Sequence, residues 1–399
     1  MRRRRFLAIL PILLVPGTVR GGSGPTVRIG FSVAQSGLFA GLARAQQRAY
    51  ELWRDRVNEA GGLDVAGTKR PVEFIWYDDQ SSPAWAARIY ESLIVDDRVD
   101  LLLAPWGASA HRAVAPVLAR HGFPLIATTA PTTAMREVAG DALWFASSVE
   151  PGRVAEAIGA LLVNLGIASV AIATNELSAE FRERLVPSLA AREITVAIDE
   201  SYPPDVADLT PTLTRIKDSG VEGVVALTQP ADAFLYMAQA RDMELGARFQ
   251  FLLAGPALPS FAAAFGKAAE GLVTAGQWTP DVAAWPGAKP FAEAYAARFG
   301  ATDALGDAAL AYVSCEILEQ AVATAGLDRA ALRAAIAGGS FDTINGPVRF
   351  TGSENAITPT ALLQLQDGAP RLIWPPSIAT AGHRSPTRSV FTPLDEPIP

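Results

Sequence analysis

Cysteine and histidine are scarce in this chain of 399 residues. Its single cysteine, Cys315, excludes an intrachain disulfide framework and any zinc cluster built from cysteine ligands. The three histidines, His111, His121 and His383, lie too far apart along the chain to form a metal-binding motif. We therefore expect a protein that works without a metal or other cofactor.

A surplus of basic residues is also missing, because the formal net charge is −7. No basic stripe interrupts this acidic balance, so a nucleic-acid partner is not expected. Half of the residues are hydrophobic and 19% are charged, which is typical of a globular protein. The length allows two domains with sizeable cores.

After the N-terminal segment the chain has no long apolar run, so no membrane helix is predicted in that part of the sequence. Basic residues 1–5 (MRRRR) precede the short apolar run 6–15, which predicts a signal peptide and leader over residues 1–24. The arginines also satisfy a twin-arginine pattern, and both export routes stay open. No cysteine follows the apolar run, so attachment as a lipoprotein is not expected. The sequence thus predicts an exported, periplasmic protein.

Apolar strands and helices alternate along most of the remaining chain. One run of this alternation covers residues 26–147, and a second begins near residue 150 and continues to about 254. Repeated βα units predict parallel sheets with helices on both faces and right-handed crossovers. Two runs predict two α/β domains, and the elements after residue 278 are too few for a third.

Residues 101–131 predict the ligand-binding edge of the first domain. Leu101–Ala104 and Leu125–Ala127 are apolar runs of the kind that a parallel sheet buries on both faces. Each ends in a loop of small or hydroxyl-bearing residues, and Ser109 stands where the N-cap of a helix over 110–120 is expected. Ligands bind at the carboxyl edge of open α/β sheets, so two adjacent parallel strands should release both loops there.

Several strings of residues resemble one known family. They are VRIGFSVAQSGLFAG at 27–41, RVNEAGGLDVAGTKRPVEFIWYDDQSSPAWA at 56–86, GFPLIATTAPT at 122–132, QARDMEL at 239–245, AEGLVTAG at 269–276 and NGPVRFTGSENA at 345–356. Together they resemble the type I periplasmic solute-binding proteins, in particular the branched-chain amino acid (Leu/Ile/Val) binding branch of ABC importers. The resemblance extends over about residues 26–374.

This resemblance implies an α/β fold of periplasmic binding protein type I. Such a fold has two Rossmann-like lobes with parallel sheets, joined by three hinge crossovers. Lobe 1 would comprise residues 26–147 and 278–346, and lobe 2 would comprise residues 148–277 and 347–375. Residues 376–399 would form a loose C-terminal tail.

The resemblance also implies a ligand site in lobe 1. In the family, hydroxyls and backbone N–H groups of two loops hold the head group of the ligand, often a carboxylate. Those loops correspond to Ala108 and Ser109 and to Thr128, Thr129 and Ala130. The residues suit this role, because a helix N-terminus offers unpaired N–H groups to an anion and threonines add hydroxyl donors. A purely structural role stays open, with Ser109 as an N-cap and the threonines as a strand end.

Lobe 2 departs from the family pattern. One tyrosine position of the amino acid binders falls near Ser178 and Ala179, and another falls on Thr228 or Gln229. The turn from Gly255 to Ala257 stands where they carry the acidic residue that pairs with the ligand ammonium. An ammonium without a counter-ion would be costly in a closed cleft. The departure argues against a simple zwitterionic amino acid unless Glu176 substitutes, and a solvated loop glutamate is the alternative reading of Glu176.

Two aromatic residues are further candidates for ligand contact. Trp106 lies between a proline and a glycine at the predicted ligand edge, where it can stack on a planar or apolar ligand. Phe39, in the loop after the first strand, has a similar position. Packing of Trp106 under its own loop is the alternative.

The predicted function is that of a substrate-binding protein for an inner-membrane ABC permease. Hinge closure over a small-molecule ligand would produce the form that the permease recognises. The ligand is expected to carry a carboxylate and an aromatic or apolar body, or to be amino-acid-like. The same fold used as a ligand-sensing receptor is the alternative function. No Gly-x-Ser-x-Gly elbow or phosphate loop is present, so we expect no enzyme, and we expect a monomer.

Overall fold

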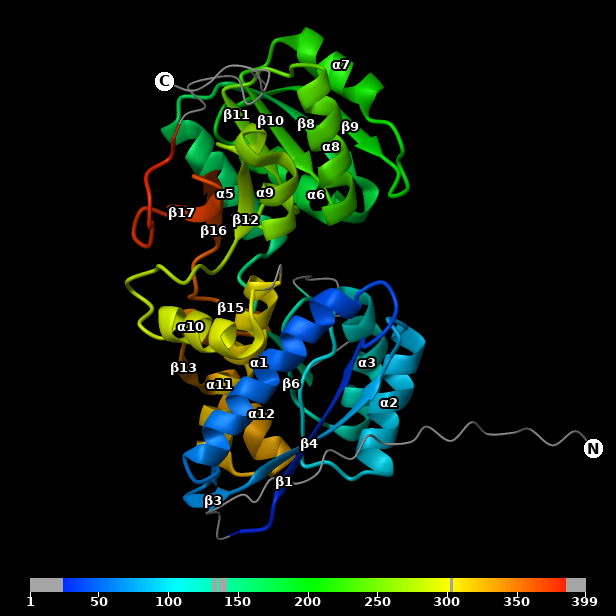
Figure 1. Cartoon of the computed structure of the whole chain (residues 1–399), viewed down its shortest axis with the longest axis vertical. Helices are drawn as coiled ribbons and strands as arrows, with labels where there is room; N and C mark the ends of the chain where they lie inside the picture. Colours follow the sequence, from blue (N-terminus) through cyan, green and yellow to red (C-terminus); the bar gives the residue numbers. More distant parts are fainter. Residues whose placement is uncertain (1–23, 131–134, 136–141, 302–303, 385–399) are drawn as a thin grey trace, which may run out of the picture.

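The computed structural model describes residues 24–130, 135, 142–301 and 304–384. Nearly all of the predicted signal segment and the end of the predicted tail lie outside these residues. Within them the chain forms two α/β bodies, which Figure 1 shows one above the other. We call the lower body lobe 1 and the upper body lobe 2, each defined by the sheets that it contains.

Lobe 1 contains the first elements of the chain together with a later group of helices and strands. Its elements are β1 (Val27–Val33), α1 (Ala40–Glu59), β2 (Leu63–Val65), β3 (Thr68–Arg70), β4 (Val72–Asp78), α2 (Pro83–Val95), β5 (Leu101–Leu102), α3 (Ala108–His121), β6 (Leu125–Ala127), β7 (Leu143–Phe145), α10 (Ala288–Phe299), α11 (Leu305–Ala325), α12 (Arg329–Gly338), β13 (Ser340–Thr343), β14 (Gly346–Thr351) and β15 (Glu354–Asn355). The strands pair in the orders β4-β1-β5 and β13-β14-β15-β7-β6, besides the β2-β3 hairpin.

Lobe 2 is built on a single seven-stranded sheet with the order β17-β16-β12-β11-β10-β8-β9. Its elements are α5 (Pro151–Asn164), β8 (Ser169–Asn175), η3 (Glu176–Ser178), α6 (Ala179–Ala190), β9 (Thr195–Tyr202), α7 (Thr210–Ser219), β10 (Gly223–Leu227), α8 (Pro230–Asp242), β11 (Phe249–Leu252), α9 (Pro259–Phe265), η4 (Gly266–Ala269), β12 (Val273–Gly276), β16 (Ala361–Gln366) and β17 (Ala369–Trp374). The strands β8 to β12 are parallel, and β16 and β17 add an antiparallel edge.

Burial explains the composition of the strands. The central strand β10 is apolar and buried at every position, as a parallel strand covered by helices on both faces requires. The edge strand β9 alternates between exposed and half-buried residues up to the buried Tyr202 at its end, and it carries Asp199 and Glu200. These carboxylates form ion pairs with Arg182 and Arg215 of the neighbouring helices. Cys315 is fully buried on α11.

The chain passes between the two lobes three times, after β7, after β12 and after β15. Three crossovers are the number that the family resemblance implied. The last one is displaced from its predicted position, because β14 pairs with β13 and β15 pairs with β7. Residues 346–355 therefore belong to the sheet of lobe 1, and the predicted change of lobe after residue 346 comes too early.

The beginning of the predicted loose tail is also ordered by hydrogen bonds. Thr380 N–H donates to Leu372 O at 2.8 Å. The side-chain amides of Gln364 and Gln366 donate to Arg384 O and Gly382 O, each at 2.8 Å. Buried glutamines on β16 need such partners, so the loose tail predicted from residue 376 is wrong up to residue 384.

Hydrogen bonds link the three crossovers to one another. Gln277 Oε1, on the second crossover, accepts from Ser147 Oγ at 2.9 Å and from Ser148 N–H at 3.0 Å. The Ser148 hydroxyl donates to Pro359 O at 3.0 Å, and Thr360 Oγ1 donates to Ser148 O. The crossovers therefore form one hydrogen-bonded strip between the lobes.

Loss of the Gln277 acceptor should weaken this strip. Gln277→Met leaves Ser148 N–H and the Ser147 hydroxyl without this partner, so we expect the free energy of unfolding to fall by about 1–3 kcal/mol. Gln277→Glu keeps an oxygen at the same place and serves as the control. Denaturant unfolding measures both variants, and a methionine variant as stable as the parent protein would contradict the role of Gln277.

Candidate functional site

Helix α3 begins at the predicted ligand edge of lobe 1, but with a different cap from the predicted one. The helix covers Ala108–His121, its N-cap is Gly107, and no side chain caps it. The prediction of Ser109 as N-cap is wrong, because the helix begins at Ala108, two residues before the predicted range. Gly107 takes the N-cap position with a φ of 89°, which a glycine adopts without strain. Ala108 is half-buried and Ser109 is exposed in the first turn. An uncapped first turn keeps N–H groups available to an anion.

The loops after β5 and β6 meet through one hydrogen bond. Gly107 N–H donates to Thr129 Oγ1 at 2.7 Å. Because that oxygen accepts the bond, the Thr129 hydroxyl hydrogen is still available to an acceptor. The strands β5 and β6 do not pair with each other in the described part of the chain, so the loops come together without the predicted strand adjacency. Thr129 and the start of α3 thus form a group of hydrogen-bond donors.

The residues beside Thr129 serve the interior of lobe 1. Thr128 is fully buried, and its hydroxyl donates to Gln46 Oε1 at 3.1 Å. Gln46 Nε2 in turn donates to Ala104 O at 2.8 Å. Ala130 is also fully buried. The Thr128 side chain therefore joins the two loops to α1, while Thr129 keeps a donor for other partners.

Trp106 contacts both Phe39, just before α1, and Asp307 of α11, which lie far apart in the sequence. Its ring centroid lies 4.8 Å from that of Phe39, with the ring planes inclined by 37°. Its indole Nε1–H donates to Asp307 Oδ2 at 3.0 Å, in the first turn of α11. All three residues are half-buried. Burial raises the pKa of Asp307 to about 6, and the indole N–H opposes part of that shift.

Asp307 is the main functional candidate that sequence reasoning missed. It lies 201 positions after Trp106, and only the packing of α11 against lobe 1 reveals their contact. The one local signal was an acidic residue in the first turn of a predicted helix, which is common because it complements the helix dipole. That signal carries no information about a ligand.

The predicted residues of lobe 2 lie at the ends of three neighbouring strands. Ser178 is fully buried after β8, and its Oγ accepts from Gln229 Nε2, after β10, at 2.9 Å. Gly255 follows β11 with a φ of 103°, and a Cβ there would come within 2.5 Å of Ala233 Cβ. Gly255 is therefore required by close packing against α8. The structure brings Ser178 and Gln229 together, and it leaves Glu176 exposed.

Asn175, the last residue of β8, is a second candidate that the sequence reasoning missed. It is 1% exposed, and its Oδ1 accepts from Leu177 N–H at 3.0 Å. Its Nδ2 has no hydrogen-bond partner among the described residues. A buried amide donor without a partner is uncommon, so Asn175 is suited to an acceptor that the protein does not supply.

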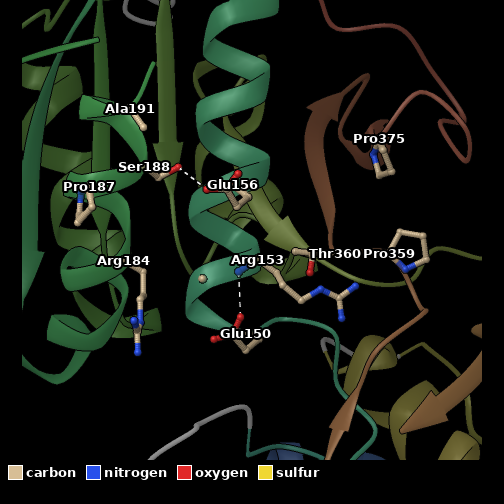
Figure 2. Close-up of a pocket in the computed structure, with 11 residues that line it drawn as sticks. Glu150, Arg153, Glu156, Arg184, Pro187, Ser188, Ala191, Pro359, Thr360 and Pro375 are labelled. Atoms are coloured by element: carbon tan, nitrogen blue, oxygen red, sulfur yellow. Dashed lines mark hydrogen bonds between the residues drawn. The ribbon is translucent and has the colours of Figure 1, made fainter. Parts of the chain in front are cut away.

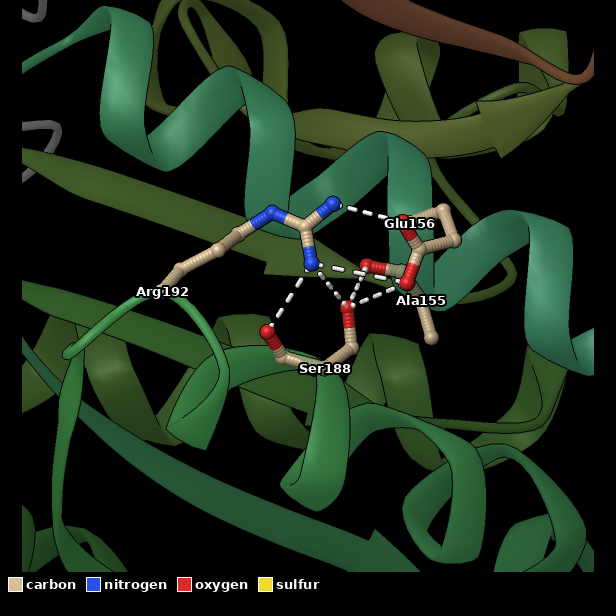
Figure 3. Close-up of polar contacts among 4 residues, drawn as sticks. All are labelled: Ala155, Glu156, Ser188 and Arg192. Atoms are coloured by element: carbon tan, nitrogen blue, oxygen red, sulfur yellow. Dashed lines mark hydrogen bonds and ion pairs between the residues drawn. The ribbon is translucent and has the colours of Figure 1, made fainter.

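Two cavities lie away from these strand ends, and none of the ten predicted residues lines either one. The first, of about 650 Å³, lies beside α5 and α6 (Figure 2). Its acidic groups already have partners: Glu150 Oε2 accepts from Arg153 N–H at 2.9 Å, and Glu156 pairs with Ser188 and Arg192 (Figure 3). The Arg153 guanidinium donates to Asn355 O, at the end of β15, and to Thr358 O, on the third crossover. This cavity is therefore bounded by groups that tie lobe 2 to the hinge.

The second cavity, of about 520 Å³, lies on lobe 1 between α1, α10 and α11. It includes Glu316, whose Oε2 accepts from Ile344 N–H at 2.8 Å. Burial raises the pKa of Glu316 to about 8. Glu316 is thus a second half-buried acid on α11, separate from the strand ends.

Comparison with known proteins agrees with this architecture. A family model described as "Periplasmic binding protein" matches residues 26–369. The chain belongs to that family. The match covers both lobes and all three crossovers of this periplasmic binding protein, so the fold class predicted from the sequence is confirmed.

Solved structures with a similar fold include transporter-associated binding proteins. The branched-chain amino acid transporter substrate-binding protein LivJ of Streptococcus pneumoniae, in complex with isoleucine, is 22% identical, with a TM-score of 0.75 over 86% of this chain and 97% of that one. A solute-binding protein of an ABC transporter from R. palustris, in complex with benzoate, is 21% identical, with a TM-score of 0.73 over 87% and 95%. A putative branched-chain amino acid ABC transporter from Silicibacter pomeroyi is 20% identical, with a TM-score of 0.78 over 91% and 99%.

Two further features of this periplasmic binding protein concern membranes and metals. No helix in the described ranges combines the length and the apolar character needed to span a bilayer. Over the same residues, no group of three or more histidine, cysteine, aspartate or glutamate side chains could hold a metal ion.

Because the pKa of Asp307 is raised, the amount by which its ionised carboxylate lowers the stability of the folded protein should depend on pH. Between the ordinary value of 3.8 and about 6, the folded protein keeps the proton that the unfolded chain releases, so stability falls as pH rises. Asp307→Asn removes this cost. We expect the variant to gain stability over the parent protein from pH 4 to pH 6, and to hold a constant advantage of about 1–3 °C in melting temperature above that range.

Thermal unfolding of both proteins from pH 4 to pH 7.5, without ligand, measures this difference. The variant keeps Trp106 hydrogen-bonded, because the asparagine Oδ1 can accept from the indole N–H. A difference in melting temperature that does not change with pH would contradict the raised pKa of Asp307.

Proposed function

We propose that this protein is the extracytoplasmic substrate-binding component of an ABC importer. It captures a small organic carboxylate between its two lobes and presents the closed form to the inner-membrane permease. The observation that carries the proposal is the uncapped N-terminus of α3 beside Thr129, at the end of lobe 1 strands in a periplasmic binding protein. Family and fold support the transport role, since the similar proteins include ABC transporter solute-binding proteins.

Lobe 1 supplies the groups that favour a carboxylate. The first turn of α3 contributes backbone N–H groups and the positive end of the helix dipole. Thr129 contributes a hydroxyl donor, because Gly107 N–H already occupies its oxygen. Trp106 precedes Gly107 in the same loop, and its half-buried ring lies against that of Phe39. A carboxylate attached to an aromatic or apolar body complements this combination.

Lobe 2 supplies neutral polar groups for the other side of the ligand. Asn175 ends β8, and Ser178 and Gln229 follow β8 and β10 at the carboxyl edge of their sheet. The hinge strip formed by Ser148, Gln277 and Thr360 is the place where the lobes can rotate. Closure brings the two edges onto the ligand, so its free energy depends on contacts that only the bound state makes.

A thermal-shift screen tests this ligand class. Purified protein should unfold at a higher temperature with at least one member of a panel of branched-chain amino acids, aromatic amino acids and benzoates. A ligand at 100 times its dissociation constant should add about 2.7 kcal/mol to stability. Failure of every carboxylate in the panel to shift the transition would contradict the proposed ligand class, and chemical conversion of the bound compound would contradict a transport role.

Trp106 should contribute to affinity for the carboxylate found in that screen. We expect Trp106→Ala to weaken binding by about tenfold or more, through the loss of an aromatic contact surface. Trp85→Ala is the matched control, because Trp85 is 40% exposed on α2 and is not among the predicted site residues. Isothermal titration calorimetry compares both with the parent protein, and equal affinity of all three would place Trp106 outside the site.

A further inference from the structure

Asp307 has one carboxylate oxygen that the protein does not use. Its Oδ2 accepts from Trp106 Nε1–H at 3.0 Å. Over residues 24–130, 135, 142–301 and 304–384, no hydrogen bond reaches its Oδ1, and no arginine, lysine or histidine pairs with it. Oδ1 is not one of the fully buried side-chain atoms that lack a hydrogen-bond partner, so this oxygen keeps some contact with solvent. Asp307 therefore presents an open acceptor with a negative charge.

The neighbours of this oxygen favour a cation as its partner. Trp106 and Phe39 lie with ring centroids 4.8 Å apart, and aromatic faces attract positively charged nitrogen. The N-terminus of α11 stabilises the carboxylate only in part, since a helix end carries about half of a unit charge. A half-buried carboxylate without a full counter-charge lowers stability, and a ligand cation would remove that cost.

The predicted site residues of lobe 2 carry no buried carboxylate that could pair with a ligand cation. Asn175, Ser178, Gln229 and Gly255 are neutral, and Glu176 is exposed. The buried carboxylate of Asp232, in the first turn of α8, already accepts from Gln229 N–H at 3.0 Å and from the Tyr202 hydroxyl at 2.6 Å. The sequence therefore argued against an amine on the ligand. Asp307 changes that conclusion, because the tertiary structure places a carboxylate on the opposite lobe, against the aromatic residue next to the anion-binding loop.

We infer that Asp307 is a specificity-determining residue, whose free carboxylate oxygen pairs with a positively charged nitrogen of the ligand. This inference rests on the proposed function. The ligand then carries both a carboxylate, held by the first turn of α3 and Thr129, and an amine, held by Asp307 beside Trp106 and Phe39. Both charged ends are bound by lobe 1, and the neutral donors of lobe 2 close over the uncharged body.

Matched pairs of ligands that differ only in the amine test the inference. The pairs are leucine with isocaproate, phenylalanine with hydrocinnamate, and para-(aminomethyl)benzoate with para-toluate, which vary the separation of amine and carboxylate. The parent protein should bind the amine-bearing member of at least one pair more tightly than its partner, by roughly tenfold or more. Calorimetry gives the ratio of affinities within each pair.

Asp307→Asn should abolish that ratio by weakening the amine-bearing member while changing affinity for its partner by less than about threefold. Trp106→Phe removes the indole N–H and keeps the Asp307 charge, so the preference for the amine should persist. Glu316→Gln is the matched control, because it neutralises another half-buried acid on α11. Thermal unfolding of each variant without ligand verifies that it is folded.

The outcomes separate the inference from the proposed function. A parent protein that binds both members of each pair equally, or an asparagine variant that keeps the preference for the amine, overturns the role of Asp307 and leaves the proposed carboxylate transport intact. A parent protein that binds no carboxylate of either kind overturns the proposed ligand class and the inference with it.

Discussion

Parallel pairing of strands is the constraint on which the rest of this structure depends. In lobe 1, β1 lies between β4 and β5, and in lobe 2 the strands β8 to β12 are parallel. Parallel strands end at one edge, so the loops and helix N-termini that follow them gather there. In Figure 1 the start of α1 lies on the side of lobe 1 that faces lobe 2. The polar groups of the candidate site are thus collected by topology rather than by their positions in the sequence.

The bond between Trp106 and Asp307 involves a carboxylate that lowers stability near neutral pH. Burial raises the pKa of Asp307, which means that the folded protein holds the negative charge at a cost near neutral pH. A protein selected for stability alone would replace this carboxylate by a neutral residue. Its presence beside an aromatic pair is understandable where the charge acts on a ligand.

The hinge combines a few polar contacts with apolar packing, because the buried core of lobe 1 extends to Ala361, Leu363 and Leu372 of lobe 2. Gln277 and Ser148 connect the crossovers, and Arg153 reaches from α5 to carbonyl groups near the end of lobe 1. Such contacts hold the crossovers together while the lobes keep separate sheets. The cavity of about 650 Å³ adjoins these contacts, and its acidic side chains are engaged within lobe 2, which distinguishes it from the strand-end site.

The sequence by itself determined the alternation of strands and helices, the two-lobed α/β class and the loops at the carboxyl ends of the strands. These features depend on local apolar patterns and on short family strings, as Leu125–Ala127 illustrates, since it is a strand with the predicted limits. Only the tertiary structure decided how those loops are used. It assigned the cap of α3 to Gly107, turned Thr128 inward, kept residues 346–355 in lobe 1 and brought Asp307 to Trp106. Each of these outcomes depends on contacts between residues far apart in the chain, and local sequence patterns do not reveal such contacts.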